Sequence, residues 1–102
     1  MPRKESKSTP KLEGSVLYDL DEAIDISSKR WHQWLQDHTS FYYQNVLGSF
    51  TARRERRRNG DYWYAYRRHQ GKLYKSYLGR AEELTREHLR DIALALGEKA
   101  GA

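Results

Sequence analysis

The sequence predicts an α+β fold: a three-stranded antiparallel sheet packed on a C-terminal helix, with a short N-terminal helix and a possible extra strand. Three observations lead to this prediction. Asn59-Gly60 and Gln70-Gly71 are turn dipeptides that divide residues 49–79 into three strand-like runs. Apolar side chains within residues 81–96 repeat with the spacing of an amphipathic helix. The length of 102 residues fits one small domain with tails.

Two segments precede the predicted sheet. Residues 1–14 are polar and contain two prolines, so we expect a disordered basic tail. Residues 15–47 are expected to form an acidic, extended strap and then a short aromatic helix, which Ser27 or Ser28 caps.

The short helix is expected to run to about Gln36. Trp31, Trp34 and Leu35 fall at i, i+3 and i+4, so they share one face. That face either packs on the protein's own core, which we favour, or forms a patch for a partner. Residues 39–46 are rich in aromatic side chains, which predicts the extra strand.

Residues 48–97 are predicted to form the sheet-and-helix domain, and residues 98–102 a tail. Its three strands are expected at residues 49–58, 61–69 and 72–79. The closing helix over 81–96 has Thr85 as its expected N-cap and Gly97 as its expected stop.

The formal net charge of +5 is unevenly distributed along the chain. Residues 12–26 hold five acidic side chains and no basic one, for a charge of −5. Residues 50–80 hold ten basic and two acidic side chains, for +8. Such a concentration is typical of proteins that bind polyanions, although a basic face that is merely solvated would look the same.

Alternation along the strands separates two faces of the predicted sheet. We assign Phe50, Ala52, Trp63, Ala65 and Leu78 to the face that the closing helix covers. The other face interleaves tyrosine with arginine and lysine. The candidate DNA-binding residues are Arg53, Arg54, Arg56, Arg57, Tyr62, Tyr64, Tyr66, Arg68, Lys75 and Tyr77.

These residue types suit nucleic acid, because arginine pairs with phosphates or guanine edges and tyrosine packs on sugars or bases. There is an alternative, in which the segment with Trp31 and Trp34 folds over this face and buries the tyrosines as a second core. In that case the face would bind nothing.

Residues 48–96 resemble two DNA-binding families in layout. A three-stranded sheet followed by a helix is the architecture of the GCC-box-binding domain of plant ethylene-response factors and of the N-terminal arm-binding domain of tyrosine recombinases. Tyr77-Leu78-Gly79 is similar to the Trp-Leu-Gly that ends the third strand of the plant domains. The resemblance implies contact with the major groove, with tyrosine in place of the plant tryptophan or glutamate. The positions that match are Tyr66, Arg68, Lys75 and Tyr77.

Residues 31–90 also look like a short module of bacterial open reading frames. The sequences WHQWL, TSFYY and YWYAYRR carry this likeness. The module sometimes precedes the ATPase region of large LuxR-type regulators, and the likeness implies a bacterial protein.

No pattern in the sequence predicts an enzyme. The chain has no cysteine, its four histidines lack metal-ligand spacing, and it has no P-loop or nucleophile elbow. We therefore expect no catalytic residue, no metal and no cofactor. No run approaches the roughly 20 apolar residues of a membrane helix and no secretory signal is visible, so we expect a cytoplasmic, nucleoid-associated protein.

The sequence thus predicts a small DNA-binding protein, either a transcriptional regulator or a mobile-element accessory factor, that contacts duplex DNA through its Arg/Tyr face. Two alternatives stay open. One is a protein-interaction adaptor that uses the Trp/Tyr-rich N-terminal half, and the other is a binder of single-stranded nucleic acid or RNA. We also expect the acidic residues 12–26 to lie against the basic face when DNA is absent.

Overall fold

Two hairpins organise the C-terminal half of the chain. The computed structural model describes residues 9–46 and 48–99. Within them β5 (Gly48–Arg57), β6 (Gly60–His69) and β7 (Lys72–Gly79) form an antiparallel meander. This meander corresponds closely to the three strands that the sequence predicts.

The two turns differ in type. Gln70 and Gly71 have φ of 52° and 79°, the left-handed values that a type I′ turn needs at both central positions. In the first hairpin Arg57 pairs with Gly60, so the turn residues are Arg58 and Asn59, not Asn59-Gly60. Neither Arg58 nor Asn59 has a positive φ, which excludes a type I′ turn there.

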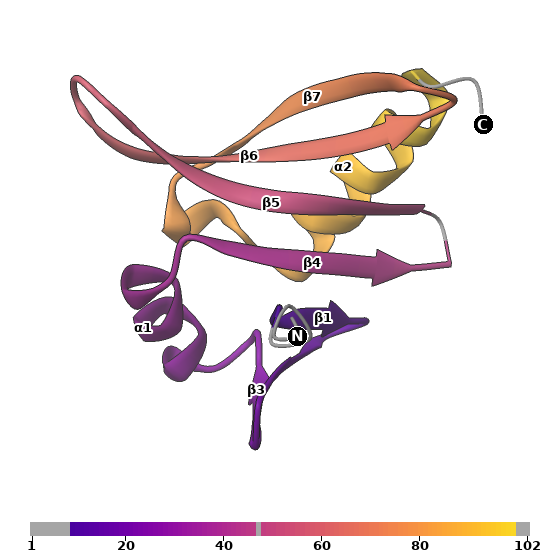
Figure 1. Ribbon diagram of the computed structural model, residues 1–102. Coiled ribbons are helices and arrows are strands. Elements are labelled where there is room, and N and C mark those ends of the chain that lie inside the picture. The colour runs from indigo at the N-terminus through magenta and orange to yellow at the C-terminus, as the bar shows by residue number, and fades with distance from the viewer. Residues whose placement is uncertain (1–8, 47, 100–102) are drawn as a thin grey trace, which may run out of the picture.

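The predicted fold class is wrong, because the meander is only part of a larger sheet. Over the described residues the sheet has seven strands in the order β3-β2-β1-β4-β5-β6-β7. It is mixed, since β1 runs parallel to β4 while the other neighbours are antiparallel (Figure 1). A three-stranded sheet plus helix, the layout shared with the plant and recombinase domains, is therefore not the fold of this protein. The other four strands are β1 (Lys11–Glu13), β2 (Val16–Asp19), β3 (Glu22–Asp25) and β4 (Ser40–Asn45).

Residues 11–25, predicted as the end of the tail and as the strap, contain three strands of the sheet. Residues 11–13 lie between β2 and β4, with Leu12 fully buried, so this part of the expected tail is an inner strand. Residues 1–8 of that tail, and 100–102 of the expected C-terminal tail, lie outside the described residues.

The acidic residues 12–26 and the basic residues 50–80 lie toward opposite edges of the sheet. β3 forms one edge and β7 forms the other. Residues 12–26 therefore do not cover the basic strands, and our expectation that they lie against the basic face is wrong. The predicted extra strand over residues 39–46 is present as β4.

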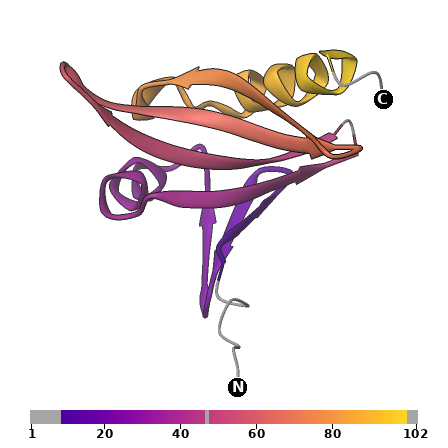
Figure 2. The ribbon, with the colours of Figure 1, turned by 45° about the horizontal axis from the view of Figure 1, so that its top comes forward.

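Two helices flank the sheet among the described residues. They are α1 (Lys29–Asp37) and α2 (Arg86–Lys99), and a 3-10 turn, η2 (Ala81–Glu83), leads into α2. Figure 2 shows α2 running beside the β5–β7 part of the sheet, with α1 near the start of β4. Neither helix is long and apolar enough to cross a membrane.

The aromatic face of α1 is core, as we favoured. Trp31 and Trp34 are both fully buried, and their rings stack with centroids 5.9 Å apart. Trp31 Nε1 donates to the Leu84 carbonyl (3.0 Å), and Trp34 Nε1 donates to the Asp19 carboxylate (2.8 Å). Each indole N–H thus keeps a hydrogen bond when buried. Phe41 of β4 meets Trp31 edge-on at 5.5 Å and links α1 to the sheet.

α2 begins after the predicted N-cap, five residues later than the predicted start at residue 81, and it ends later than predicted. The His88 N–H donates to Thr85 Oγ1 (3.2 Å), which confirms Thr85 as the N-cap. The helix continues to Lys99, and Gly97 is buried inside it and does not mark its end. The burial of Leu96 and Gly97 against the core favours one more turn.

Candidate nucleic-acid interface

The sheet has a covered face and an open face, as alternation predicts. The covered face carries the buried side chains that we assigned to it, which are Phe50, Ala52, Trp63, Ala65 and Leu78. Trp31 and Trp34 pack into the same core, so the described N-terminal segment does not fold over the tyrosines as a second core. The open face carries Tyr62, Tyr64 and Tyr66, which are half-buried, and Tyr77, which is 50% exposed.

Cations lie over the tyrosine rings of the open face. Lys75 Nζ is 4.4 Å from the ring centroid of Tyr64 and 5.4 Å from that of Tyr66. The Arg57 guanidinium lies 5.1 Å from the Tyr64 centroid, and that of Arg53 lies 5.6 Å from Tyr66. These distances are within the range of cation–π attraction, about 6 Å. The pairing of β6 with both β5 and β7 brings cations from two strands onto the same rings.

Arg80 belongs to this group, although the sequence did not single it out. Its guanidinium lies 5.3 Å from the Tyr62 ring centroid and donates to Tyr62 Oη (3.2 Å), and this hydrogen bond raises the pKa of Arg80. The backbone places it there: Gly79 adopts φ +114°, and the Arg80 N–H donates to Glu83 Oε1 (2.9 Å). Strand alternation could not assign Arg80 to a face of the sheet, because Arg80 follows the end of β7.

The tyrosines are also in contact with one another. The Tyr77 ring centroid is 5.4 Å from that of Tyr64 and 6.1 Å from that of Tyr62. Loss of solvation raises the pKa of the Tyr77 hydroxyl, so this phenol stays neutral at physiological pH. We refer to the whole group as the tyrosine–cation face. Its residues are Arg53, Arg57, Tyr62, Tyr64, Tyr66, Lys75, Tyr77 and Arg80.

A carboxylate lies in the middle of the tyrosine–cation face. Glu55 accepts hydrogen bonds from Tyr66 Oη and Arg57 Nη2, and Lys75 Nζ lies 3.5 Å from its Oε1. Its side chain is 24% exposed. The sequence reasoning counted Glu55 only as a charge. Its spacing of two residues from both Arg53 and Arg57 was the signal that places it on their face.

β5 and β6 extend beyond both of their neighbours. The pairing of β4 with β5 ends at Arg53, and the pairing of β7 with β6 ends at Trp63. Residues 54–57 and 60–62 therefore pair across this hairpin, and one further backbone bond runs from the Arg54 N–H to the Thr39 carbonyl (2.9 Å). With the turn they form what we call the β5–β6 ribbon. Figure 1 shows its turn projecting beyond the neighbouring strands. Its exposed side chains include Arg56, Arg57 and Arg58, and Arg56 Nε is 3.5 Å from the Asp61 carboxylate.

Three predicted site residues lie away from the tyrosine–cation face. Arg56 has the parity of Arg54, opposite to that of Arg57, and is exposed on the ribbon. Arg54 points to the covered side, where its Nη1 donates to the carbonyls of Leu35 (3.2 Å) and Gln36 (3.0 Å) in the last turn of α1. Arg68 is exposed on β6 and pairs with Leu73, at the end of the strand remote from the ribbon.

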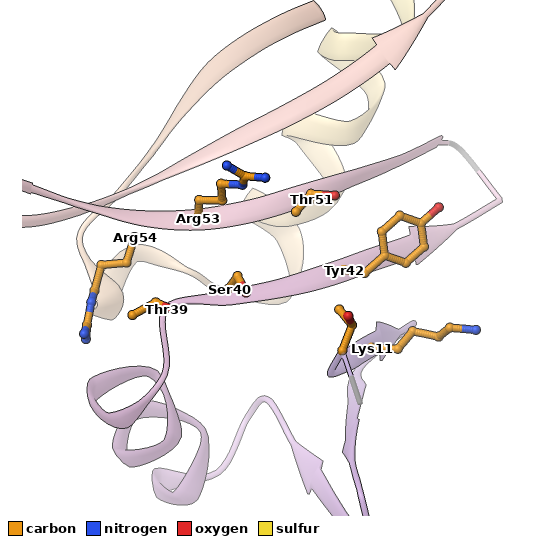
Figure 3. A pocket seen from close by; sticks show the side chains of 8 residues that line it. Lys11, Thr39, Ser40, Tyr42, Thr51, Arg53 and Arg54 are labelled. Carbon is orange, nitrogen blue, oxygen red and sulfur yellow. The ribbon is translucent and has the colours of Figure 1, made fainter. Parts of the chain in front are cut away.

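An open pocket of about 620 Å³ adjoins Arg53 on β4 and β5 (Figure 3). Its described lining offers hydroxyl groups and cations, and it includes no carboxylate. In the figure Arg53 points toward β6 and Arg54 points down beside α1. The lining residues are Thr9, Lys11, Thr39, Ser40, Tyr42, Thr51, Arg53 and Arg54.

Comparisons with known proteins do not assign the chain to a family. The chain matches no family model, no curated protein and no solved structure. Among residues 9–46 and 48–99, no three His, Asp or Glu side chains are grouped so that they could hold a metal ion. The function is therefore inferred from the residues of the open face and their arrangement.

Proposed function

We propose that this protein binds duplex DNA, with the β5–β6 ribbon in the major groove and the tyrosine–cation face against the sugar–phosphate backbone. The observation that carries the proposal is the continuity of these two surfaces. Three exposed arginines on a projecting two-stranded ribbon lead directly into a face where cations and tyrosines alternate.

The dimensions favour the ribbon as the element that enters the groove. The major groove is about 12 Å wide and admits a two-stranded β-ribbon. Seven strands spaced about 4.8 Å apart span roughly 29 Å, so the sheet as a whole is too wide to enter. Residues 54–57 reach about 14 Å and residues 60–62 about 10 Å, and both lengths exceed the groove depth of about 8.5 Å.

The side chains suit the roles that this placement gives them. Arg56, Arg57 and Arg58 would reach base edges or phosphates, since guanidinium pairs with both. The tyrosine rings would pack on sugars. The pocket beside Arg53 would take a backbone phosphate, because hydroxyl groups and cations are the usual partners of phosphate oxygens.

The charge distribution supports one orientation on DNA. The acidic strands β2 and β3 and the basic strands β5–β7 lie at opposite ends of the sheet. A polyanion would attract one end and repel the other, which steers the ribbon toward the duplex. A role in transcription or as a mobile-element accessory factor, and association with the nucleoid, would follow from such binding.

A second candidate is single-stranded nucleic acid, DNA or RNA. The 50% exposure of Tyr77 at the sheet edge favours it, because an accessible ring can stack on an unpaired base. The adaptor alternative lacks a comparable observation, since both tryptophans on which it drew are buried.

The test is fluorescence anisotropy with a labelled 20-base-pair duplex, the matching single strand and the RNA equivalent. Replacing Arg56, Arg57 and Arg58 together with alanine should weaken duplex binding about tenfold or more. The matched control replaces the exposed Lys29, Arg86 and Arg90, which removes the same charge from the helices. The control should weaken binding much less. Equal losses in the two triple variants would contradict the proposal, and tighter binding of the single strand would favour the second candidate.

A further inference from the structure

We propose that Glu55 is a built-in competitor of the nucleic-acid backbone: its carboxylate occupies a phosphate site formed by Tyr66 Oη, Arg57 and Lys75. This inference rests on the proposed function and adds to it. It identifies one specific phosphate site and a residue of the chain that weakens binding there.

The donors around Glu55 are those that a phosphate prefers. A tyrosine hydroxyl and a guanidinium donate to its two oxygens, and an ammonium group lies 3.5 Å away. Carboxylates and phosphates take the same charge-assisted hydrogen bonds from such groups. The position is also accessible, since the Glu55 side chain is 24% exposed and lies on the open face.

The carboxylate has two opposing effects. It holds Arg57, Lys75 and Tyr66 in one arrangement, so the donors are already positioned when a phosphate arrives. It also neutralises part of the positive charge of this group, so an incoming phosphate must displace Glu55 or remain close to it. Both outcomes lower the affinity for a polyanion. A phosphate that replaces the carboxylate is bound better than a phosphate that only lies close to it.

The test is the variant Glu55→Gln in the full chain, measured by anisotropy with the same 20-base-pair duplex. The amide oxygen can still accept from Tyr66 Oη, so the local structure is kept while the negative charge is removed. We expect the variant to bind about three- to tenfold more tightly than the wild type. The slope of log K against log salt should become steeper by about 1, as for one additional phosphate contact.

Glu87→Gln is the matched control for net charge. Glu87 is exposed in the first turn of α2, and α2 packs on the covered side of the sheet. The substitution removes the same charge on the other side of the sheet from the tyrosine–cation face and the pocket. This control should change the affinity by less than twofold.

A second variant tests the phosphate site itself. Adding Lys75→Ala to Glu55→Gln should cancel most of the gain in duplex affinity, because the positive charge that Glu55 no longer neutralises is then removed. If the wild type binds the duplex but Glu55→Gln binds equally or more weakly with the same thermal midpoint, Glu55 only orders the face and this inference is overturned. If neither protein binds at 50 mM salt, the proposed function itself fails, and this inference with it.

Discussion

Arg53 and Arg54 are consecutive in the sequence and lie on opposite sides of β5. Arg53 extends over the Tyr66 ring on the open face, and Arg54 hydrogen bonds to the last turn of α1 on the covered side. Two identical side chains thus have different partners, and their roles in binding and in stability can be separated.

Arg54→Ala should lower the free energy of unfolding, and Arg53→Ala should not. Loss of the hydrogen bonds from Arg54 to two helix carbonyls should cost about 1 kcal/mol, because these bonds are charge-assisted but partly exposed. Urea unfolding of both variants measures this. Under folding conditions, Arg53→Ala should weaken duplex binding more than Arg54→Ala does. The reverse order in either measurement would contradict the assignment of the two faces.

Gly79→Ala should destabilise the protein by more than the cost of placing an alanine at a positive φ. Gly79 has φ +114°, and a Cβ there would clash with Glu83 Oε1, so Glu83 would have to release the Arg80 N–H. Gly71→Ala is the control, since Gly71 has φ +79° and open space around it. We expect about 1–2 kcal/mol for the control and a larger loss for Gly79→Ala, both by urea unfolding. Equal losses would show that the Glu83 contact does not matter.

Trp31→Ala should cost about 3–5 kcal/mol of folding free energy, because a fully buried indole and its hydrogen bond to the Leu84 carbonyl are lost. His32→Ala, exposed on the same helix, should change stability by less than about 0.5 kcal/mol. Thermal unfolding monitored by circular dichroism compares the two. A stable Trp31→Ala variant would restore the interpretation of this helix face as a partner-binding surface.

The Glu22–Arg30 pair gives a pH-dependent prediction. The hydrogen bond from Arg30 (2.8 Å) holds the pKa of Glu22 below its ordinary value of 4.5. A lowered pKa stabilises the folded state above the unfolded pKa, and this contribution is lost as pH falls through the folded value. Side-chain NMR titration should show the Glu22 pKa rising toward 4.5 in Arg30→Ala. An unchanged Glu22 pKa would show that the ion pair is not formed in solution.

The β5–β7 meander and the start of α2 could be predicted because their signals are local. Gln70-Gly71 fixes a turn, and Thr85 caps a helix, whatever the rest of the chain does. The other half of the sheet had no comparable signal. β1, β2 and β3 each bury a single aliphatic core residue, which is too short a pattern to distinguish a strand from an extended strap. These residues are Leu12, Leu17 and Ile24.

The face on which a site residue lies could be predicted where the same strand contained clear core residues. Trp63 and Ala65 fixed the parity of β6 and therefore placed its tyrosines on the other face. In β5, Arg54 shares the parity of the buried Phe50 and Ala52, and its contact with α1 agrees with this. Because arginines occupy both parities of this strand, their residue type alone did not separate its two faces. Arg80 depends on the backbone conformation of Gly79, which the residue pattern does not specify.

The salt dependence of duplex binding tests the central claim most directly. Affinity of the wild-type protein for a 20-base-pair duplex is measured by anisotropy at several salt concentrations from 50 to 300 mM. With about six phosphate contacts from the ribbon, the tyrosine–cation face and the pocket, log K should fall with log salt at a slope of about −5. Absence of binding at 50 mM salt, or a slope near zero, would contradict the account.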